Sequence, residues 1–328
     1  MLYYGDIDEL ENDIGRVDAY MAEYLHDTSM NPMLNAVLET IIATKGKKVR
    51  PLLLLLAGRF GPQWPESRDR LCKMAACIEM IHMASLIHDD IVDDAPTRRG
   101  RETVQSRFGK DMAVYAGDFV MSRILYYLFR EATPETGMLL AKTVESMCYG
   151  EMCQLTCNFN TETTMSDYLS NIYGKTASLF IATCRIGAAE SGCGVQSTEV
   201  FSEIGKHIGY LFQLRDDLLN FVSNVQREGK PVFTDFLNGT YTLPILHTLG
   251  HPHHGSRLKE MLRAASFGGA SAIELEEIRS LIIQCKGIEF TRSMIRAHAA
   301  EARELLTNLP RKQAARGIRA MLDYLEGE

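Results

Sequence analysis

The chain has 328 residues, of which 46% are hydrophobic and 23% are charged, and its net charge is -7 at pH 7. This length is enough to bury a large core. The negative charge argues against general nucleic-acid binding. The eight cysteines form no regular CxxC pairs and no N-terminal targeting segment is visible, so we expect reduced thiols in a cytoplasmic protein. The longest apolar run, residues 52–57, is too short to span a bilayer, which predicts peripheral membrane contact at most.

Nearly every segment of the chain has helical periodicity, and the alternation typical of strands is scarce. Breaks are expected at the basic stretch 45–51 and the polar stretch 224–238. Because no linker is long or low in complexity, the pattern predicts a single all-α domain over residues 1–328. The expected helices span residues 7–25, 31–43, 51–60, 67–94, 111–132, 135–158, 165–184, 198–222, 241–249, 256–265, 272–285, 290–306 and 313–326.

An acidic stretch ends the expected helix 67–94. Asp89 and Asp93 share one face of this helix, and Asp90 and Asp94 share the neighbouring face. Oxygen ligands at this density suit Mg²⁺, which leaves positions open for water or phosphate oxygens. Two arginines follow at residues 98–99 and could clamp phosphate. A solvated helix end is the competing interpretation.

A second acidic pair lies in the apolar helix 198–222, where Asp216 and Asn220 share a face. Acidic pairs on two helices of one bundle suggest facing walls of a metal cavity. Lys175 lies in a segment that lacks the upstream glycine of a phosphate-binding P-loop, so nucleotide binding is not supported. Basic residues at several breaks suit a diphosphate, although each alone could be a surface charge: Lys47, Arg50, Arg98, Arg99, Lys175 and Lys230.

Taken together, these residues resemble the trans-prenyltransferases, or trans-isoprenyl diphosphate synthases. The resemblance covers about residues 10–324, with weaker support after residue 251. It implies an isoprenoid-synthase-type helical bundle around a central cavity, an enzyme that transfers prenyl groups, and a homodimer. The motifs that carry it, in order, are Gly-Lys-Lys-Val-Arg-Pro at 46–51, His-Asp-Asp-Ile-Val-Asp at 88–93 with Arg-Arg-Gly at 98–100, Gly-Lys-Thr at 174–176, Phe-Gln at 212–213 with Asp-Asp at 216–217, and Gly-Lys-Pro at 229–231 followed by Thr-Leu-Pro at 242–244.

The resemblance also implies a role for each site residue. Asp89 and Asp93 would bind two Mg²⁺ on an allylic diphosphate (farnesyl or geranyl), and Asp216 would bind a third. Thr176 and Gln213 would flank the reacting carbon. The same allylic diphosphate would be contacted by Arg98, Lys175 and Lys230. Isopentenyl diphosphate would be held by Lys47, Arg50, His82 and Arg99.

Electrostatics supports this interpretation, because cations placed where the leaving diphosphate gains charge lower the barrier. Apolar walls protect the carbocation from water. The chain departs from the family pattern at Asn220, which replaces a carboxylate, and at Thr240, where the family often has lysine. Lys45 and Lys48 replace the usual glycine and arginine of the first basic motif. We expect activity nevertheless, since the metal-binding aspartates remain.

Product length should depend on the helix that precedes Asp89. In the family, an aromatic residue near Ala84 and Ser85 blocks the hydrocarbon tunnel, and here both residues are small. Ile81 follows on the lining face. A medium-to-long product, near hexaprenyl to octaprenyl, is therefore expected, of the kind used for quinone side chains. Alternatively, the small residues merely pack helices closely, and the chain is a farnesyl or geranylgeranyl diphosphate synthase.

Other functions compete with this one. The chain could be the large subunit of a heteromeric heptaprenyl diphosphate synthase, which needs a dissimilar partner chain. His88 and Asp89 could belong to a metal phosphohydrolase, but the second acidic pair and the basic motifs would then go unused. His251, His253 and His254 could bind a metal, although a His-rich turn with a proline is more often a solvated loop.

Overall fold

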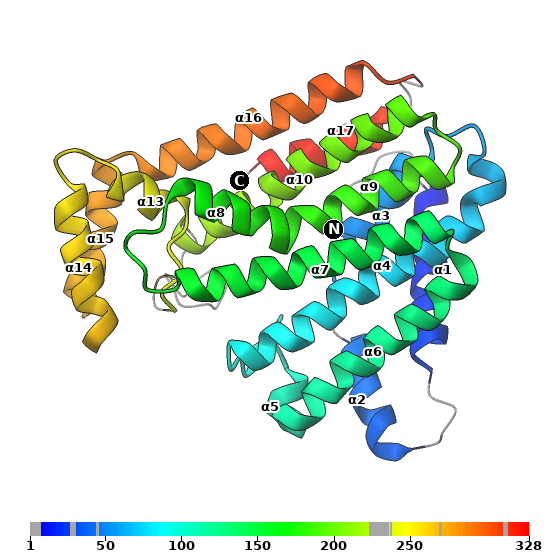
Figure 1. Cartoon of the computed structure of the whole chain (residues 1–328), viewed down its shortest axis with the longest axis horizontal. Coiled ribbons are helices and arrows are strands. Elements are labelled where there is room, and N and C mark those ends of the chain that lie inside the picture. The colour runs from blue at the N-terminus through cyan, green and yellow to red at the C-terminus, as the bar shows by residue number, and fades with distance from the viewer. Residues whose placement is uncertain are drawn as a thin grey trace. The chain divides into compact units, whose positions relative to one another are not determined.

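A computed structural model describes residues 8–26, 31–43, 46–222, 236, 238–268, 271–310 and 314–327. The described chain is almost entirely helical (Figure 1), which confirms the all-α prediction. Internal contacts divide it into two compact units. Unit 1 comprises residues 1–142, 182–201 and 310–318, and unit 2 comprises residues 143–181, 202–309 and 319–328. The expected single domain stays a prediction.

Unit 1 contains a run of helices and one hairpin. Its elements are α1 (Asp8–Leu25), α2 (Pro32–Ala43), α3 (Val49–Gly58), α4 (Trp64–Val92), β1 (Thr97–Arg98), β2 (Arg101–Glu102), α5 (Val104–Phe108) and α6 (Lys110–Glu131). Elements of unit 2 are α8 (Met165–Ile172), the π-helical turn η1 (Tyr173–Ala177), α13 (Leu243–Leu249), α14 (Gly255–Gly268), α15 (Ala272–Gln284) and α16 (Gly287–Thr307). Residues of both units occur in α7 (Pro134–Cys157), α9 (Ser178–Glu190), α10 (Val195–Val222) and α17 (Ala315–Glu326).

Helix α4 is the core helix of unit 1 and packs against α6, α3 and α1. Its residues from Leu71 to Ile81 are almost all buried, because this stretch has apolar side chains on every face. By length and composition alone α4 could cross a membrane, but 67% of its apolar window is buried inside the protein. That burial is typical of a core helix. It holds α4 in place, and α4 ends in the first acidic motif.

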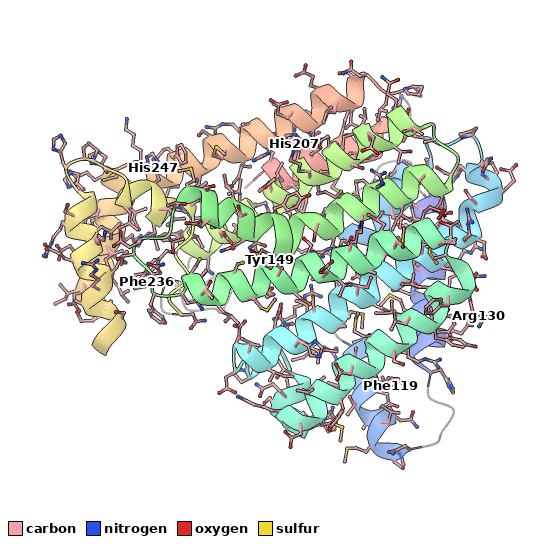
Figure 2. All side chains as sticks on the ribbon, in the orientation of Figure 1. Phe119, Arg130, Tyr149, His207, Phe236 and His247 are labelled. Atoms are coloured by element: carbon pink, nitrogen blue, oxygen red, sulfur yellow. The ribbon has the colours of Figure 1, made fainter. Side chains whose placement is uncertain are left out.

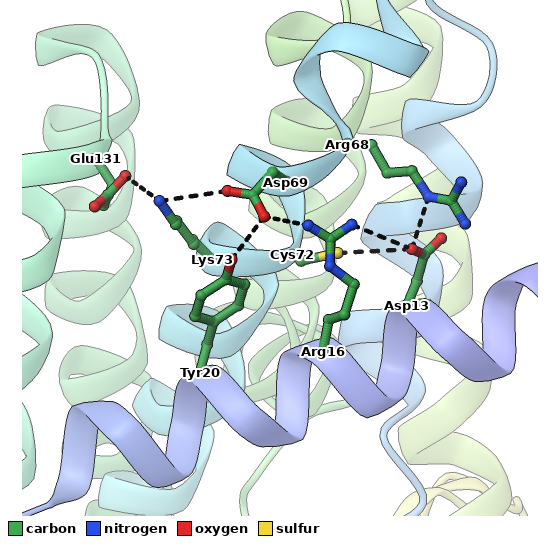
Figure 3. A network of polar contacts seen from close by, with 8 residues as sticks. All are labelled: Asp13, Arg16, Tyr20, Arg68, Asp69, Cys72, Lys73 and Glu131. Carbon is green, nitrogen blue, oxygen red and sulfur yellow. Dashed lines mark hydrogen bonds and ion pairs between the residues drawn. The ribbon is translucent and has the colours of Figure 1, made fainter.

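A polar network anchors the N-terminal half of α4 to its neighbours (Figure 3). Asp69 accepts a hydrogen bond from the Tyr20 hydroxyl at 2.6 Å and pairs with Arg16, both from α1. Lys73 donates to Glu131 of α6 at 3.2 Å. The hydrogen bond to Asp69 raises the pKa of Tyr20. Partly exposed pairs of this kind each contribute little stability, so the network serves mainly to set the position of α4 between α1 and α6.

Unit 2 is organised around α13, which packs against α16, α14 and α8. The close approach of α13 and α16 depends on Gly287, because a Cβ at this residue would lie 2.5 Å from the backbone oxygen of Pro244. Helices α14 and α15 pack against each other and against α13, and α15 also packs against α16; Figure 1 shows α14 and α15 in yellow and gold.

The structure differs from the sequence prediction in two places. The helix expected over residues 165–184 is divided by the π-helical turn η1, and its second part, α9, continues to Glu190. The hairpin of β1 and β2 and the short helix α5 were not predicted, because two-residue strands and a single helical turn are too short to have a hydrophobic period.

Candidate active site

The first acidic motif occupies the last turn of α4. Asp89 is half-buried, and Asp93, the C-cap residue, is exposed. Asp90 is only 6% exposed and accepts a 2.7 Å hydrogen bond from Nε of Arg98. Asp94 has φ 49° and pairs with Lys110 at 2.9 Å. The four carboxylates therefore divide into two that pair with cations of the following segment and two, Asp89 and Asp93, that share the other face.

Because Asp90 is buried, its charged form depends on the positive charge of Arg98. Desolvation raises the pKa of Asp90, and the charge and hydrogen bond of Arg98 oppose that rise. A buried carboxylate without a cation would be costly. The ion pair therefore stabilises the charged form of Asp90 and, at the same time, ties the hairpin to the end of α4.

The hairpin presents the two arginines of the motif. Thr97 pairs with Glu102 and Arg98 with Arg101, so that Arg99 and Gly100 form a two-residue loop. These loop residues have φ of 52° and 74°, which is the conformation of a type I′ turn and explains the glycine.

The segment that follows the hairpin is closed against the end of α4. The Thr103 hydroxyl and the Gln105 side-chain amide each donate a 2.8 Å hydrogen bond to the backbone oxygen of Ala95. The Thr103 hydroxyl also accepts a hydrogen bond from the Ser106 N–H at the start of α5. Through these bonds, the position of the arginine loop depends on α4 and α5.

Unit 1 contains a cavity of about 200 Å³ on the same face of α4 as Asp90. Lys48, Arg98 and Arg99 supply cationic groups to its lining, and His82 of α4 is a further lining residue. Its apolar portion comes from α1, α2, α4 and the first residue of α5. Four acids, Asp18, Glu79, Asp90 and Glu102, also line the cavity, and Asp90 is paired with Arg98. Guanidinium and ammonium groups in a concave site can bind a polyanionic group such as diphosphate.

Glu79 is the acid buried beneath these cations. Its side chain lines the cavity, and Oε1 lies 4.0 Å from Nζ of Lys48. Arg50 is 7% exposed; burial lowers its pKa to about 10, although the charge of Glu79 opposes that fall. His82 has a pKa well below its usual value, chiefly because it is buried and also because Arg50 and Arg99 are near. His82 is therefore neutral at pH 7 and able to donate a hydrogen bond without adding charge.

The first basic motif contributes one of its two lysines to the cavity lining, and the role expected of Lys47 stays a prediction. Lys47 is exposed and does not line the cavity, whereas Lys48 does. Lys48 has φ 52° and lies 3.1 Å from Asp18 of α1. A Cβ at Gly46 would lie 2.9 Å from Arg99 Nη1, so glycine allows the close approach of this segment to the arginine loop.

The three residues expected to control product length lie on the side of α4 opposite the cavity, given 100° per residue. Ala84 and Ile81 are 1% and 3% exposed, and Ser85 is half-buried and donates to the backbone oxygen of His82 at 2.8 Å. Their burial fits close helix packing as well as a tunnel wall. Their role in chain length stays a prediction.

In unit 2, the Gly-Lys-Thr motif forms the π-helical turn η1. A Cβ at Gly174 would lie 2.8 Å from the backbone oxygen of Ser146 and 3.0 Å from Cα of Gly150. The two glycines therefore allow η1 and α7 to touch by their backbones. The extra residue of a π turn re-aims the side chains next to it, and such turns are frequent at functional sites.

Lys175 extends from this turn to Glu151 of α7. Its Nζ lies 2.8 and 2.9 Å from the two carboxylate oxygens. Both side chains are about 30% exposed, at 29% and 32%, so the pair remains accessible to a ligand. A diphosphate oxygen could replace Glu151 at the ammonium group.

A chain of hydrogen bonds connects η1 to the second acidic motif. The Thr176 hydroxyl donates to Gln213 Oε1 at 2.8 Å, and Gln213 Nε2 donates to Asp217 Oδ1 at 2.7 Å. The Tyr168 hydroxyl of α8 donates to Asp217 Oδ2 at 2.5 Å. Asp217 is 5% exposed, and each of its oxygens accepts a hydrogen bond from one of these neutral donors. The Gln213 amide is thereby fixed in one orientation.

Asp216, the expected metal ligand of this motif, is exposed, and Asn220 on the same face is half-buried. Thr240, where the family often has lysine, donates instead to the Asn158 side chain at 3.2 Å. Lys230 lies outside the described residues. The relation of Asp216 to the first acidic motif, which belongs to the other unit, stays a prediction.

Three residues of these sites were missed by sequence reasoning. Glu79 could have been noticed as a charged residue in the middle of an apolar helix. Glu151 and Tyr168 have no such signal, because their partners are distant in the sequence and only the folded backbone brings them together.

Comparisons with known proteins agree with this geometry. Residues 31–278 match the family model described as polyprenyl synthetase. Heptaprenyl diphosphate synthase component 2 of Bacillus subtilis is 32% identical over 294 residues, or 90% of this chain and 82% of that protein.

Solved structures are similar over nearly the whole chain. The crystal structure of heptaprenyl diphosphate synthase from Staphylococcus aureus has a TM-score of 0.90 and 26% identity, and covers 97% of this chain and 98% of its own. A polyprenyl synthase from Caulobacter crescentus, complexed with calcium and isoprenyl diphosphate, has a TM-score of 0.87 and 27% identity, with 99% of both chains covered. The chain belongs to the polyprenyl synthetase family, and it is a prenyltransferase.

Proposed function

We propose that this prenyltransferase condenses isopentenyl diphosphate with an allylic diphosphate, head to tail and in trans, to make a polyprenyl diphosphate of medium to long chain. The observation that carries the proposal is the cavity of unit 1 into which Lys48, Arg98 and Arg99 bring positive charge, beside the acidic last turn of α4. One anionic substrate can bind the cations directly, while the other needs a bridging metal at the carboxylates.

The donor set of the acidic motifs fits magnesium. Asp89, Asp93 and Asp216 offer only carboxylate oxygens, at partly or fully exposed positions where ligand phosphates and water can complete an octahedron. Magnesium bound by these aspartates would neutralise the charge that develops on the leaving diphosphate. Three ions per active site are expected, two at Asp89 and Asp93 and one at Asp216.

Each cationic side chain has a distinct task in this scheme. Arg99, Arg50 and Lys47, with His82, hold the isopentenyl diphosphate, whose C–O bond does not break and which needs only to be positioned. Arg98 and Lys175 contact the allylic diphosphate. Arg98 is oriented for this by Asp90, and Lys175 by Glu151.

The reacting carbons need a water-free environment, because water would add to the allylic cation. The Thr176 hydroxyl and the Gln213 amide contribute dipoles that are already paired with each other, so they do not act as nucleophiles. The proton released after the new C–C bond forms passes to the departing diphosphate, and no protein base is required in this reaction.

Product length near hexaprenyl to octaprenyl is supported by two observations. The residues that precede Asp89 by one turn are small, and the two similar proteins from Bacillus subtilis and Staphylococcus aureus are called heptaprenyl diphosphate synthases. Replacing Ala84 with Tyr is expected to shorten the main product by at least one isoprene unit, measured by chromatography of the dephosphorylated products. An unchanged product distribution would remove Ala84 from the tunnel wall.

Oligomeric state is a further part of the proposal. Large apolar side chains are exposed on α6, including Tyr115, Tyr126 and Phe129, the last being 88% exposed. Arg130 and Phe119, labelled in Figure 2, lie on the same helix. A surface of this kind is usually covered by another chain. We propose a homodimer, with a dissimilar partner subunit as the second candidate because one relative is named as a component.

The decisive experiment is to incubate the purified chain alone with farnesyl diphosphate, isopentenyl diphosphate and magnesium, and then to size the products. Medium- or long-chain products from a homodimer support the main proposal. C20 products alone support the geranylgeranyl alternative. Absence of turnover in the chain alone, with activity restored by a second subunit, supports the heteromeric alternative.

A further inference from the structure

The turn between α13 and α14 carries three histidines, at residues 251, 253 and 254, and the function proposed above uses none of them. Two of these residues lie beside a cysteine that is distant in sequence. One ligand atom each from His251, His254 and Cys285 lie within 4.8 Å of one another. Imidazole nitrogen and thiolate sulfur are the donors that zinc prefers, and magnesium does not use them.

Backbone contacts hold the ligands in two separate turns. At the end of α13, the N–H of His251 donates to Thr248, and its carbonyl accepts from Gly255 at 2.9 Å. Cys285 is the C-cap residue of α15, and its N–H donates to Leu281 at 2.9 Å. Because α13 and α14 both pack against α15, the two turns are held together by the fold and not by one flexible loop.

Burial distinguishes this cluster from a solvated His-rich turn. Cys285 is only 4% exposed, whereas His251 and His254 are half-buried. The imidazoles therefore lie between a buried sulfur and solvent, which leaves a fourth position for water. His247 of α13, labelled in Figure 2, is stacked on Phe290 at 4.2 Å and is occupied by that contact.

The distances suit a site that closes when the metal binds. Bonds of about 2.0 Å to nitrogen and 2.3 Å to sulfur place tetrahedral ligand atoms about 3.5 Å apart, so the side chains must move inward by roughly 1 Å. Rotation of the two half-buried rings can supply this movement. Zinc at Nδ1 of His251 would replace the long 3.3 Å hydrogen bond that this atom accepts from the N–H of His253.

We propose that His251, His254 and Cys285 form a binding site for a divalent cation of intermediate softness such as Zn²⁺, with water as the fourth ligand. On binding, the S–H bond of Cys285 breaks, a zinc–sulfur bond forms, and the proton passes to solvent. The metal joins the α13–α14 turn to the end of α15. Its role is to stabilise unit 2, and it takes no part in prenyl transfer.

Cobalt substitution tests the site directly, because tetrahedral cobalt with a thiolate ligand has a charge-transfer band in the near ultraviolet. The full-length protein is treated with chelator, dialysed and titrated first with Co²⁺ and then with Zn²⁺. We expect one cobalt per chain with the thiolate band, bleached by one equivalent of zinc. Zinc is also expected to raise the unfolding temperature. No band together with no thermal shift would overturn the proposal.

Matched variants separate this site from adventitious binding. Cys285→Ser should abolish the thiolate band, and His254→Asn should weaken zinc binding more than about tenfold. The controls are His253→Asn, which changes the third histidine of the same turn, and Cys153→Ser, which changes a thiol on α7. Equal losses in His253→Asn and His254→Asn, or loss of the band in Cys153→Ser alone, would contradict the assignment. Magnesium-dependent turnover should be unchanged in all four variants, and its loss would contradict the structural role.

Discussion

The two acidic motifs place consecutive aspartates on a helix, and the buried member of each pair accepts hydrogen bonds from a different kind of donor. Asp90, on α4, is paired with the cationic Arg98. Asp217, on α10, is held by the neutral donors Tyr168 and Gln213. In each motif the aspartate just before the buried one, Asp89 or Asp216, is more exposed than its neighbour.

The comparison shows that each pair divides two tasks between adjacent residues. The buried aspartate organises protein groups, and the more exposed one is available to a metal. The donors differ in charge: Arg98 brings a positive charge to Asp90, whereas Tyr168 and Gln213 bring none to Asp217.

The largest effect is expected from the exposed aspartates. Asp93→Asn and Asp216→Asn should each lower kcat/KM by more than about a hundredfold, because each removes charge that stabilises the leaving diphosphate. Unfolding temperatures should stay unchanged. Steady-state assays at saturating magnesium check this, with Asp111→Asn, an exposed acid at the start of α6, as the control. Nearly full activity in Asp216→Asn would show that the second motif is not a metal site.

The buried aspartates should instead affect stability. Asp90→Asn and Asp217→Asn are each expected to cost about 1–3 kcal/mol, because buried partners lose an acceptor. Denaturant unfolding measures the loss. A double-mutant cycle with Tyr168→Phe should show strong coupling to Asp217 and none to Asp90. Coupling of Tyr168 to both residues would mean that the motifs are not anchored independently.

Lowering the pH is expected to destabilise unit 2 through a pair of histidines on α10 and α16. His298 of α16 lies 3.0 Å from His207 of α10 (labelled in Figure 2), and burial lowers the pKa of His298 from 6.5 to about 4. The unfolded chain then binds more protons than the folded one between these pH values. Stability should therefore be complete above pH 6.5 and fall as the pH drops toward 4, by on the order of 2 kcal/mol.

The variant His298→Phe keeps an aromatic ring against Tyr210 and removes the titrating group. On acidification, the free energy of unfolding should decrease less in this variant than in the parent protein. Urea unfolding at several pH values measures both. His253→Asn, on an exposed turn, serves as the control. An identical pH dependence in parent and His298→Phe would assign the acid sensitivity to other groups.

The smallest effect is expected from restoring the missing carboxylate. Asn220→Asp places a second charge on the face of Asp216. The magnesium concentration for half-maximal activity should fall about fivefold, which corresponds to about 1 kcal/mol. A magnesium titration at fixed substrate tests it. No change would indicate that Asn220 already supplies an adequate oxygen ligand.

Much of the fold could be predicted from the sequence, because helical periodicity is a local property. The predicted starts and ends of α1 and α2 agree with the structure to within one residue. The π-helical turn was not predicted, since a single extra residue leaves no mark on a hydrophobic pattern. It depends on the contact of Gly174 with Gly150, which lies on a different helix.

Part of the candidate site could also be predicted from the sequence, because the spacing of residues along a helix is a local property. Asp89, Asp93 and Asp216 could be found because their spacing along one helix defines a face. Lys48 could not be separated from Lys47, since adjacent residues in a loop point in directions that only the backbone decides. Lys48, which has a left-handed φ, is the one that lines the cavity.

The sequence by itself determined the all-α class, the positions of the acidic and basic motifs and the family to which they point, because each depends on residue type and spacing within one segment. Only the tertiary structure decided which aspartate of each pair is buried and what anchors it. It also decided that Glu79 lies under the cations and that Cys285 meets two histidines of a distant turn. Burial and pairing are properties of contacts between segments, and no single segment encodes them.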